Sequence, residues 1–175
     1  MAVKDRELRG LTRRQLLKGA TAMGAFVIGS GYVAGPTAAW ATEMKALKPE
    51  SFATLVQMAR DIYPHDKVAD EYYAAAVKGY DVQEKSEIAE IGIDALNKRA
   101  REMKGDDYLN IGWERDRVDV LRSMEEDAFF QTVRGGLVTG LYNQKAIWPI
   151  FGYEGESYSQ GGYLHRGFDD IAWIG

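Results

Sequence analysis

The spacing of apolar residues most constrains the fold of this chain. Between positions 49 and 142, apolar side chains recur every three or four residues in five successive stretches. That period places them on one face of an α-helix. Runs that alternate apolar and polar residues, which are typical of half-buried strands, do not occur there. The sequence therefore predicts an all-α protein: a small bundle of about five helices, followed by a long irregular tail.

The boundaries of the helices follow from proline, glycine and the apolar period. Pro49 suits a first helical turn, and Gly79 and Gly105 are placed as C-terminal stops. The five helices are expected at Pro49 to about Tyr63, Asp66 or Asp70 to Gly79, Glu84 to Lys104, Trp113 to about Glu126, and Phe129 to Tyr142. The buried stripe predicted for the third helix consists of Ile88, Ile91, Ala95 and Leu96.

The tail, residues 144–175, combines six glycines with seven aromatic residues and has no helical period. Disordered segments usually contain few aromatics, so we expect the tail to be ordered. Its rings must pack either on the chain's own helices or on a partner, and Tyr and Trp are enriched at interfaces. Gly136 and Gly140 share one helical face and would allow close approach by another helix of this chain or by a partner. The candidate partner interface is Gly136, Gly140, Trp148, Phe151, Tyr153, Tyr163, His165, Arg166, Phe168 and Trp173.

The first 41 residues have the features of an export signal. A polar, mostly basic start precedes an uncharged, glycine-rich apolar run from Gly19 to Ala34, which is shorter than a spanning helix needs. Ala39 and Ala41 supply the small residues that a signal peptidase reads, and cleavage is expected after Ala41. The run Arg13, Arg14, Gln15, Leu16, Leu17 and Lys18 resembles a twin-arginine signal. We therefore expect three parts: the signal (1–41), a helical domain (42–143) and the tail (144–175).

Composition excludes several classes of function. The chain contains no cysteine and two histidines, which rules out disulfides, thiolate-bound metals or clusters, covalently attached c-type haem and a multi-histidine metal site within one chain. Beyond residue 41 the sequence holds 16 basic and 24 acidic residues, a formal charge of −8. This balance disfavours nucleic acid and anionic membranes as partners. No phosphate-binding or dinucleotide-binding glycine motif is present, so no cofactor is expected in this chain.

The remaining candidates for chemistry are His65, Asp66 and His165. His65 and Asp66 could act as a base with an orienting acid, but their place after Pro64 equally fits a turn that ends a helix. A signal typical of folded, cofactor-loaded cargo thus precedes a chain without a recognisable cofactor site. A second polypeptide carried out with this one would explain the combination.

Several segments resemble the gluconate 2-dehydrogenase subunit 3 family. The resemblance extends over nearly the whole chain beyond the signal, and it includes the signal. The matching segments are residues 61–66 (DIYPHD), 129–134 (FFQTVR), 140–143 (GLYN), 148–155 (WPIFGYEG) and 161–173 (GGYLHRGFDDIAW).

The resemblance implies a non-catalytic small subunit of a periplasmic sugar, polyol or alcohol dehydrogenase. Its large subunit would be an FAD-containing flavoprotein of the glucose–methanol–choline oxidoreductase type, and a c-type cytochrome, which carries haem c, often takes the electrons. The small subunit would supply the signal read by the twin-arginine translocase and help the flavoprotein to mature. A partner could hold the complex at the inner membrane. Two alternatives stay open: a self-sufficient secreted enzyme or ligand-binding protein that uses His65, Asp66 and His165, and a structural protein anchored by an uncleaved signal helix.

Overall fold

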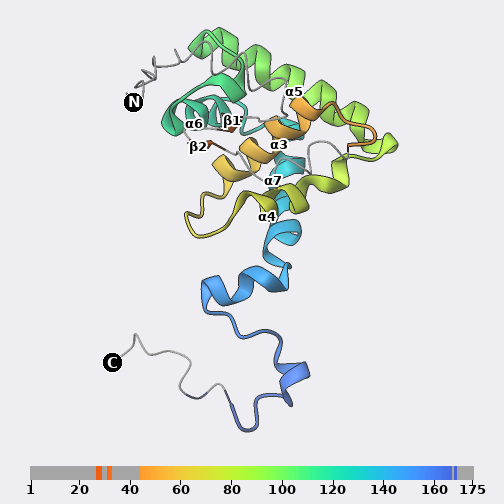
Figure 1. Ribbon diagram of the computed structural model, residues 1–175, viewed down its shortest axis with the longest axis vertical. Coiled ribbons are helices and arrows are strands. Elements are labelled where there is room, and N and C mark those ends of the chain that lie inside the picture. Colours follow the sequence, from red (N-terminus) through yellow and green to blue (C-terminus); the bar gives the residue numbers. More distant parts are fainter. Residues whose placement is uncertain (1–26, 29–30, 33–43, 167, 169–175) are drawn as a thin grey trace, which may run out of the picture.

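A computed structural model of the protein describes residues 27–28, 31–32, 44–166 and 168 (Figure 1). The predicted all-α bundle is confirmed. The α-helices of the described part are α3 (Pro49–Ile62), α4 (Asp70–Val77), α5 (Gln83–Lys104), α6 (Glu114–Arg122) and α7 (Ala128–Tyr142). The short 3₁₀ helices are η2 (Lys78–Tyr80), η3 (Tyr108–Asn110), η4 (Lys145–Phe151) and η5 (Ser157–Gln160).

Helix α3 is the central element of the bundle. Every residue from Ser51 to Ala59 is buried, and α4, α5, α6 and α7 all contact this helix. A helix that is buried on all sides must be apolar or must satisfy its polar side chains internally. Helix α3 does both: its Leu55 and Val56 are fully buried, and its Gln57 side-chain amide donates a hydrogen bond to Asp61.

Helices α4 and α7 pack closely because α7 carries a glycine at their contact. A Cβ built on Gly140 would lie 3.0 Å from the carbonyl oxygen of Ala76. The close approach at Gly140 therefore serves packing within this chain. Gly136 lies one turn earlier, where a Cβ would be 3.5 Å from the Tyr80 hydroxyl.

Helix α5 buries a different face from the one predicted. Its buried residues include Ala89, Gly92 and Leu96, whereas Ile88 and Ile91 are exposed by 63% and 64%. The reason lies in α7: the Phe129 ring occupies the space where a side chain at Gly92 would project, with Cγ 2.2 Å from a built Cβ. Ala89 and Gly92 face the bundle so that α5 can approach it, with Ile93 beside them. Of the predicted stripe, Leu96 is buried as expected, whereas Ile88, Ile91 and Ala95 point outward.

Two predicted helix boundaries differ from the structure. Helix α4 begins at Asp70, one of the two expected starts, but it ends at Val77, before Gly79, which lies within η2. The Asp70 side chain does not cap the helix and forms an ion pair with Arg60 at 2.6 Å. Helix α6 ends at Arg122, four residues before the expected Glu126, because a tight turn follows. At the end of that turn Asp127 accepts a hydrogen bond from the Phe129 N–H and so caps α7.

Two carboxylates hold the stretch that leads into α3. Asp81 accepts backbone hydrogen bonds from Lys45, Ala46 and Leu47 at 2.8–3.0 Å. Burial opposes ionisation of this carboxyl, but the three N–H donors outweigh it and lower the pKa of Asp81. Glu90 of α5 accepts from the Lys48 N–H and the Ser51 hydroxyl. Both contacts fasten residues 45–51 to the body at α5.

Within the predicted signal, two strands of two residues each pair in antiparallel orientation: β1 (Val27–Ile28) and β2 (Gly31–Tyr32). The export residues Arg13, Arg14, Leu16, Leu17 and Lys18 and the cleavage residues Ala39 and Ala41 lie outside the described residues, as does Trp173. None of the helices in the described ranges is both long and apolar enough to cross a bilayer.

Candidate functional site: the C-terminal arm and its root

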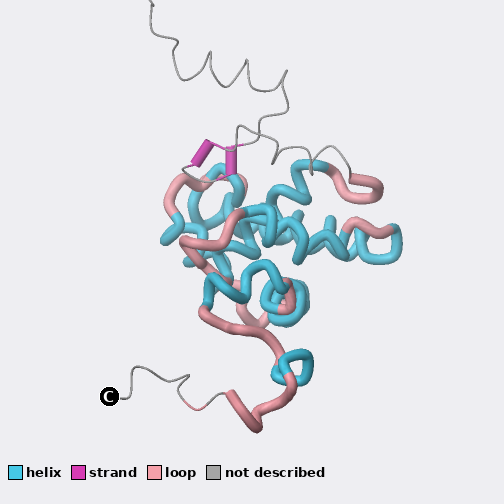
Figure 2. The backbone as a smooth tube through the Cα atoms, turned by 60° about the horizontal axis from the view of Figure 1, so that its bottom comes forward, coloured by secondary structure: helices cyan, strands magenta, loops and turns pink. Residues whose placement is uncertain are grey.

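The chain beyond α7 leaves the helical body as an arm (Figures 1 and 2). We call residues 144–166 and Phe168 the C-terminal arm. It is less irregular than predicted, because it contains η4 and η5. Four of its glycines, Gly152, Gly155, Gly161 and Gly162, have positive φ values of 72–103°. Such values favour glycine, so the glycine content of the tail follows from the turns between and after the 3₁₀ helices.

The root of the arm is fastened to the body by side-chain hydrogen bonds. The Gln144 amide donates to the carbonyl oxygens of Tyr72 in α4 and Gly140 in α7, both at 2.8 Å. The Trp148 indole N–H donates to the Tyr142 carbonyl oxygen at 2.8 Å. Ile147 is fully buried in the core. Helix η4 is thus part of the body's packing, and the arm becomes free of the body only beyond it.

The turn after α3 meets this root. His65 Nε2 lies 2.7 Å from the Tyr142 hydroxyl, 77 residues later in the chain. The His65 ring also contacts the rings of Tyr142 and Phe151 edge-on, with centroids 5.7 and 4.9 Å apart. Burial, and secondarily the neighbouring Tyr63, raise the pKa of Tyr142, so its hydroxyl stays protonated. His65 therefore joins the body to the start of the arm.

A second tyrosine, Tyr73 of α4, holds the same turn through its hydroxyl group. The Tyr73 hydroxyl donates to the Tyr63 carbonyl oxygen at 2.6 Å and accepts from the His65 N–H at 3.2 Å. Burial raises the pKa of Tyr73 against the opposing influence of the His65 N–H and the Arg60 charge. The turn predicted at Pro64 and His65 is present, and its backbone is held in one position by α4.

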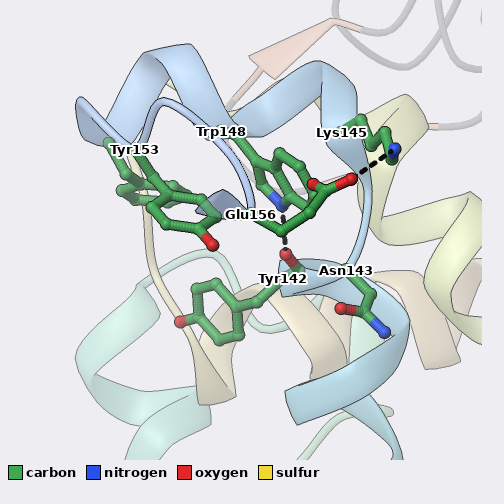
Figure 3. A pocket seen from close by; sticks show the side chains of 7 residues that line it. Tyr142, Asn143, Lys145, Trp148, Tyr153 and Glu156 are labelled. Carbon is green, nitrogen blue, oxygen red and sulfur yellow. Dashed lines mark hydrogen bonds and ion pairs between the residues drawn. The ribbon is translucent and has the colours of Figure 1, made fainter. Parts of the chain in front are cut away.

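An open groove of about 580 Å³ lies along the arm root (Figure 3). The Lys145 ammonium lies 5.5 Å from the Trp148 ring centroid and 3.5 Å from the Glu156 carboxylate. Tyr153 meets the Trp148 ring edge-on at 5.1 Å. The groove is lined by Tyr142, Asn143, Lys145, Trp148, Phe151, Tyr153 and Glu156. Its walls are mainly aromatic, and its two charges neutralise each other.

Farther out, large apolar side chains of the arm face solvent. Tyr158 is 94% exposed, Leu164 81%, Phe168 77% and Tyr163 71%. The backbone that carries them is nevertheless tied together. The Gly162 N–H donates to the Ser157 carbonyl oxygen at 2.7 Å, and Arg166 pairs with Glu154. A backbone that is held by internal hydrogen bonds but leaves aromatic and leucine side chains exposed is typical of an interaction site.

The structure separates the residues predicted for an independent active site. His65 sits at the arm root, half-buried between aromatic rings, whereas Asp66 is exposed next to it. His165 lies exposed near the end of the arm. Among the described residues, no hydrogen bond, ion pair or ring contact joins His165 to His65 or Asp66.

The most buried charged cluster was not foreseen from the sequence. Arg117 of α6 donates two hydrogen bonds to Asp61 of α3, at 2.7 and 3.0 Å, and a third to the Ile111 carbonyl oxygen. The Tyr108 hydroxyl donates to the same carboxylate at 2.6 Å. Burial and the Asp61 charge together raise the pKa of Tyr108 well above its ordinary value. No buried side-chain nitrogen or oxygen of the cluster lacks a hydrogen-bond partner, and its bonds join α3, η3 and α6.

Comparisons with known proteins assign no family and no structural relative to this chain. Within residues 44–166 and 168, no three His, Asp or Glu side chains gather closely enough to hold a metal ion. No protein-family model, curated protein or solved structure matches the sequence or the fold.

Proposed function

We propose that this chain is the small, non-catalytic subunit of a periplasmic FAD-dependent sugar, polyol or alcohol dehydrogenase. It binds the flavoprotein large subunit through its C-terminal arm and escorts that subunit through twin-arginine export and maturation. The large subunit holds FAD and carries out the oxidation, and a c-type cytochrome takes up the electrons.

The observation that carries this proposal is the exposed apolar surface of the arm. Six of the twelve large apolar side chains that are exposed in the described residues lie on the arm, which makes up about a fifth of those residues. They are Phe151, Tyr153, Tyr158, Tyr163, Leu164 and Phe168. Gathered exposed apolar side chains of this size mark interaction sites, and aromatic residues supply most hot spots in protein interfaces.

The family resemblance supports the same proposal through the residues that carry it. The early segment 61–66 contains Asp61, which joins three helical elements, and His65, which meets the arm root. The later segments 140–143 and 148–155 contain Tyr142, Trp148 and Phe151, which form that root. Three of the five resembling segments thus contribute to the root at which the arm leaves the body. A subunit whose arm must reach a partner needs such a root.

Export of the partner tests the escort role. In the native host, the double substitution Arg13→Lys with Arg14→Lys should leave the flavoprotein in the cytoplasm, because a partner without its own signal depends on this one. The measurement is dehydrogenase activity and flavoprotein immunoblotting in periplasmic and cytoplasmic fractions.

The matched control changes the two arginines that precede the motif, Arg6→Lys with Arg9→Lys, and should leave export intact. Normal amounts of flavoprotein in the periplasm of the Arg13/Arg14 variant would show that the flavoprotein does not depend on this chain for export.

A further inference from the structure

We infer that the arm recognises an uncharged, apolar groove on the partner protein, and that its binding depends on aromatic burial rather than on ion pairs. This inference rests on the proposed function and adds the chemistry of the partner's surface. It follows from where the arm's charges are, from which side chains are left exposed, and from the contrast with the body.

The charged side chains of the arm pair with one another. Residues 144–166 contain two cationic and two anionic side chains. Lys145 pairs with Glu156 across the groove at the root, and Arg166 pairs with Glu154 across the turn beyond it. The first pair keeps Lys145 over the Trp148 ring. The arm is therefore electrically neutral over these residues, and its ion pairs shape the arm itself.

The body carries a different surface. Residues 44–143 contain 14 basic and 19 acidic side chains, a formal charge of −5. Its exposed large apolar residues are spread over α5, α7 and the residues that directly precede α5 and α6, as with Ile88, Val138 and Trp113. A partner that docked on the body would meet this net charge, whereas a partner that docks on the arm does not. Within the described residues, a balanced charge and several exposed aromatic rings occur together on the arm.

These features favour a protein groove over two other occupants. A phospholipid surface that contains anionic lipids has a negative potential and attracts clusters of Lys and Arg, which the arm lacks. A second copy of this chain would bring a second negative body close to the first. Tyr158, Tyr163 and Leu164 are highly exposed in this chain. An apolar groove on a different protein would bury them.

The test uses the complex formed in the native host and recovered through a tag joined to Gly175 by a flexible linker. The probe is the flavoprotein that remains bound, quantified by flavin absorbance per chain. We expect the flavin retained per chain to change less than about twofold when NaCl in the wash rises from about 0.1 M to 1 M, a range over which the screening length falls from about 10 Å to 3 Å. Tyr158→Ser combined with Tyr163→Ser should lower retention at least about tenfold, as expected for hot-spot residues.

Trp113→Ser is the matched control, because it removes an aromatic ring of similar exposure from the body; it should leave retention unchanged. A retention that falls at least tenfold with salt, or that survives the double tyrosine substitution, overturns the inference while the proposed function stands. A tagged chain that recovers no flavoprotein under any condition overturns the proposed function as well. Recovery of a dimer of this chain alone, by light scattering, assigns the arm to self-association and also overturns the inference.

Discussion

Asp61 is the single residue on which the bundle depends most. It accepts hydrogen bonds from Arg117, Tyr108 and Gln57, so its carboxylate connects α3 to η3 and α6. A buried charge that loses its partner is strongly destabilising. Asp61→Asn should therefore lower the free energy of unfolding by about 3–5 kcal/mol, measured by urea denaturation of residues 42–175.

Asp66→Asn provides the control within the same segment. Asp66 is exposed, so its substitution should change the free energy of unfolding by no more than about 0.5 kcal/mol. Equal effects of the two substitutions would contradict the structural role assigned to the cluster. The sequence could not reveal the pairing of Asp61 with Arg117, because the two residues are 56 positions apart and carry no shared motif.

Asp81 gives a pH-dependent contribution to stability. Its pKa is lowered in the folded protein, since three backbone N–H groups outweigh the opposing influence of burial. The folded state therefore binds fewer protons than the unfolded state near that pKa. The contribution is present above the unfolded pKa of about 3.9 and is lost as the pH falls through the lower folded value.

The prediction is that Asp81→Asn lowers the melting temperature at neutral pH and flattens its fall between about pH 5 and pH 2. Thermal denaturation followed by circular dichroism across this range is the measurement. Asp94→Asn, an exposed position of α5, should reproduce the pH profile of the unchanged protein. An Asp81 variant with that same profile would show that the hydrogen bonds that Asp81 accepts from residues 45–47 make no contribution to stability.

At the scale of the elements, two helical glycines should respond to the same substitution in opposite directions. Gly92→Ala places a Cβ into the Phe129 ring, and overpacking costs about 1–3 kcal/mol. Gly135→Ala in α7 meets nothing within 4 Å, so its higher helix propensity should stabilise by about 0.5–1 kcal/mol. Chemical denaturation of the two variants measures whether the free energy of unfolding falls or rises in each of them. A stabilising Gly92→Ala would show that Phe129 moves aside without cost.

The helices themselves could be predicted from sequence, because apolar period, Pro49 and Gly105 act locally. The face of α5 that is buried could not be predicted in this way. Hydrophobicity alone favoured Ile88 and Ile91 as buried residues, yet the position of Phe129 selects the small residues around Gly92. Steric fit between helices is a property of the packed bundle. The same limit applies to Gly140, whose contact with Ala76 was only one of two open interpretations.

For the whole molecule, the sequence indicated an ordered aromatic tail but left open where its rings would pack. The structure divides them. The root, with Ile147 and Trp148, packs on the helical body, whereas Tyr158, Tyr163 and Phe168 face solvent. No local sequence signal marks that division, because it depends on where Gln144 and His65 fasten the chain. The exposed portion is the surface through which we propose that this chain binds its partner.

The most direct test of this account is the mass and absorption spectrum of the native complex recovered with this chain from the periplasm under mild conditions. We predict a heteromer in which this chain accompanies a larger protein with a flavin absorption spectrum, since the cofactor belongs to the partner. A colourless monomer that carries out its own reaction, and loses it on substitution of His65 or His165, would contradict the account.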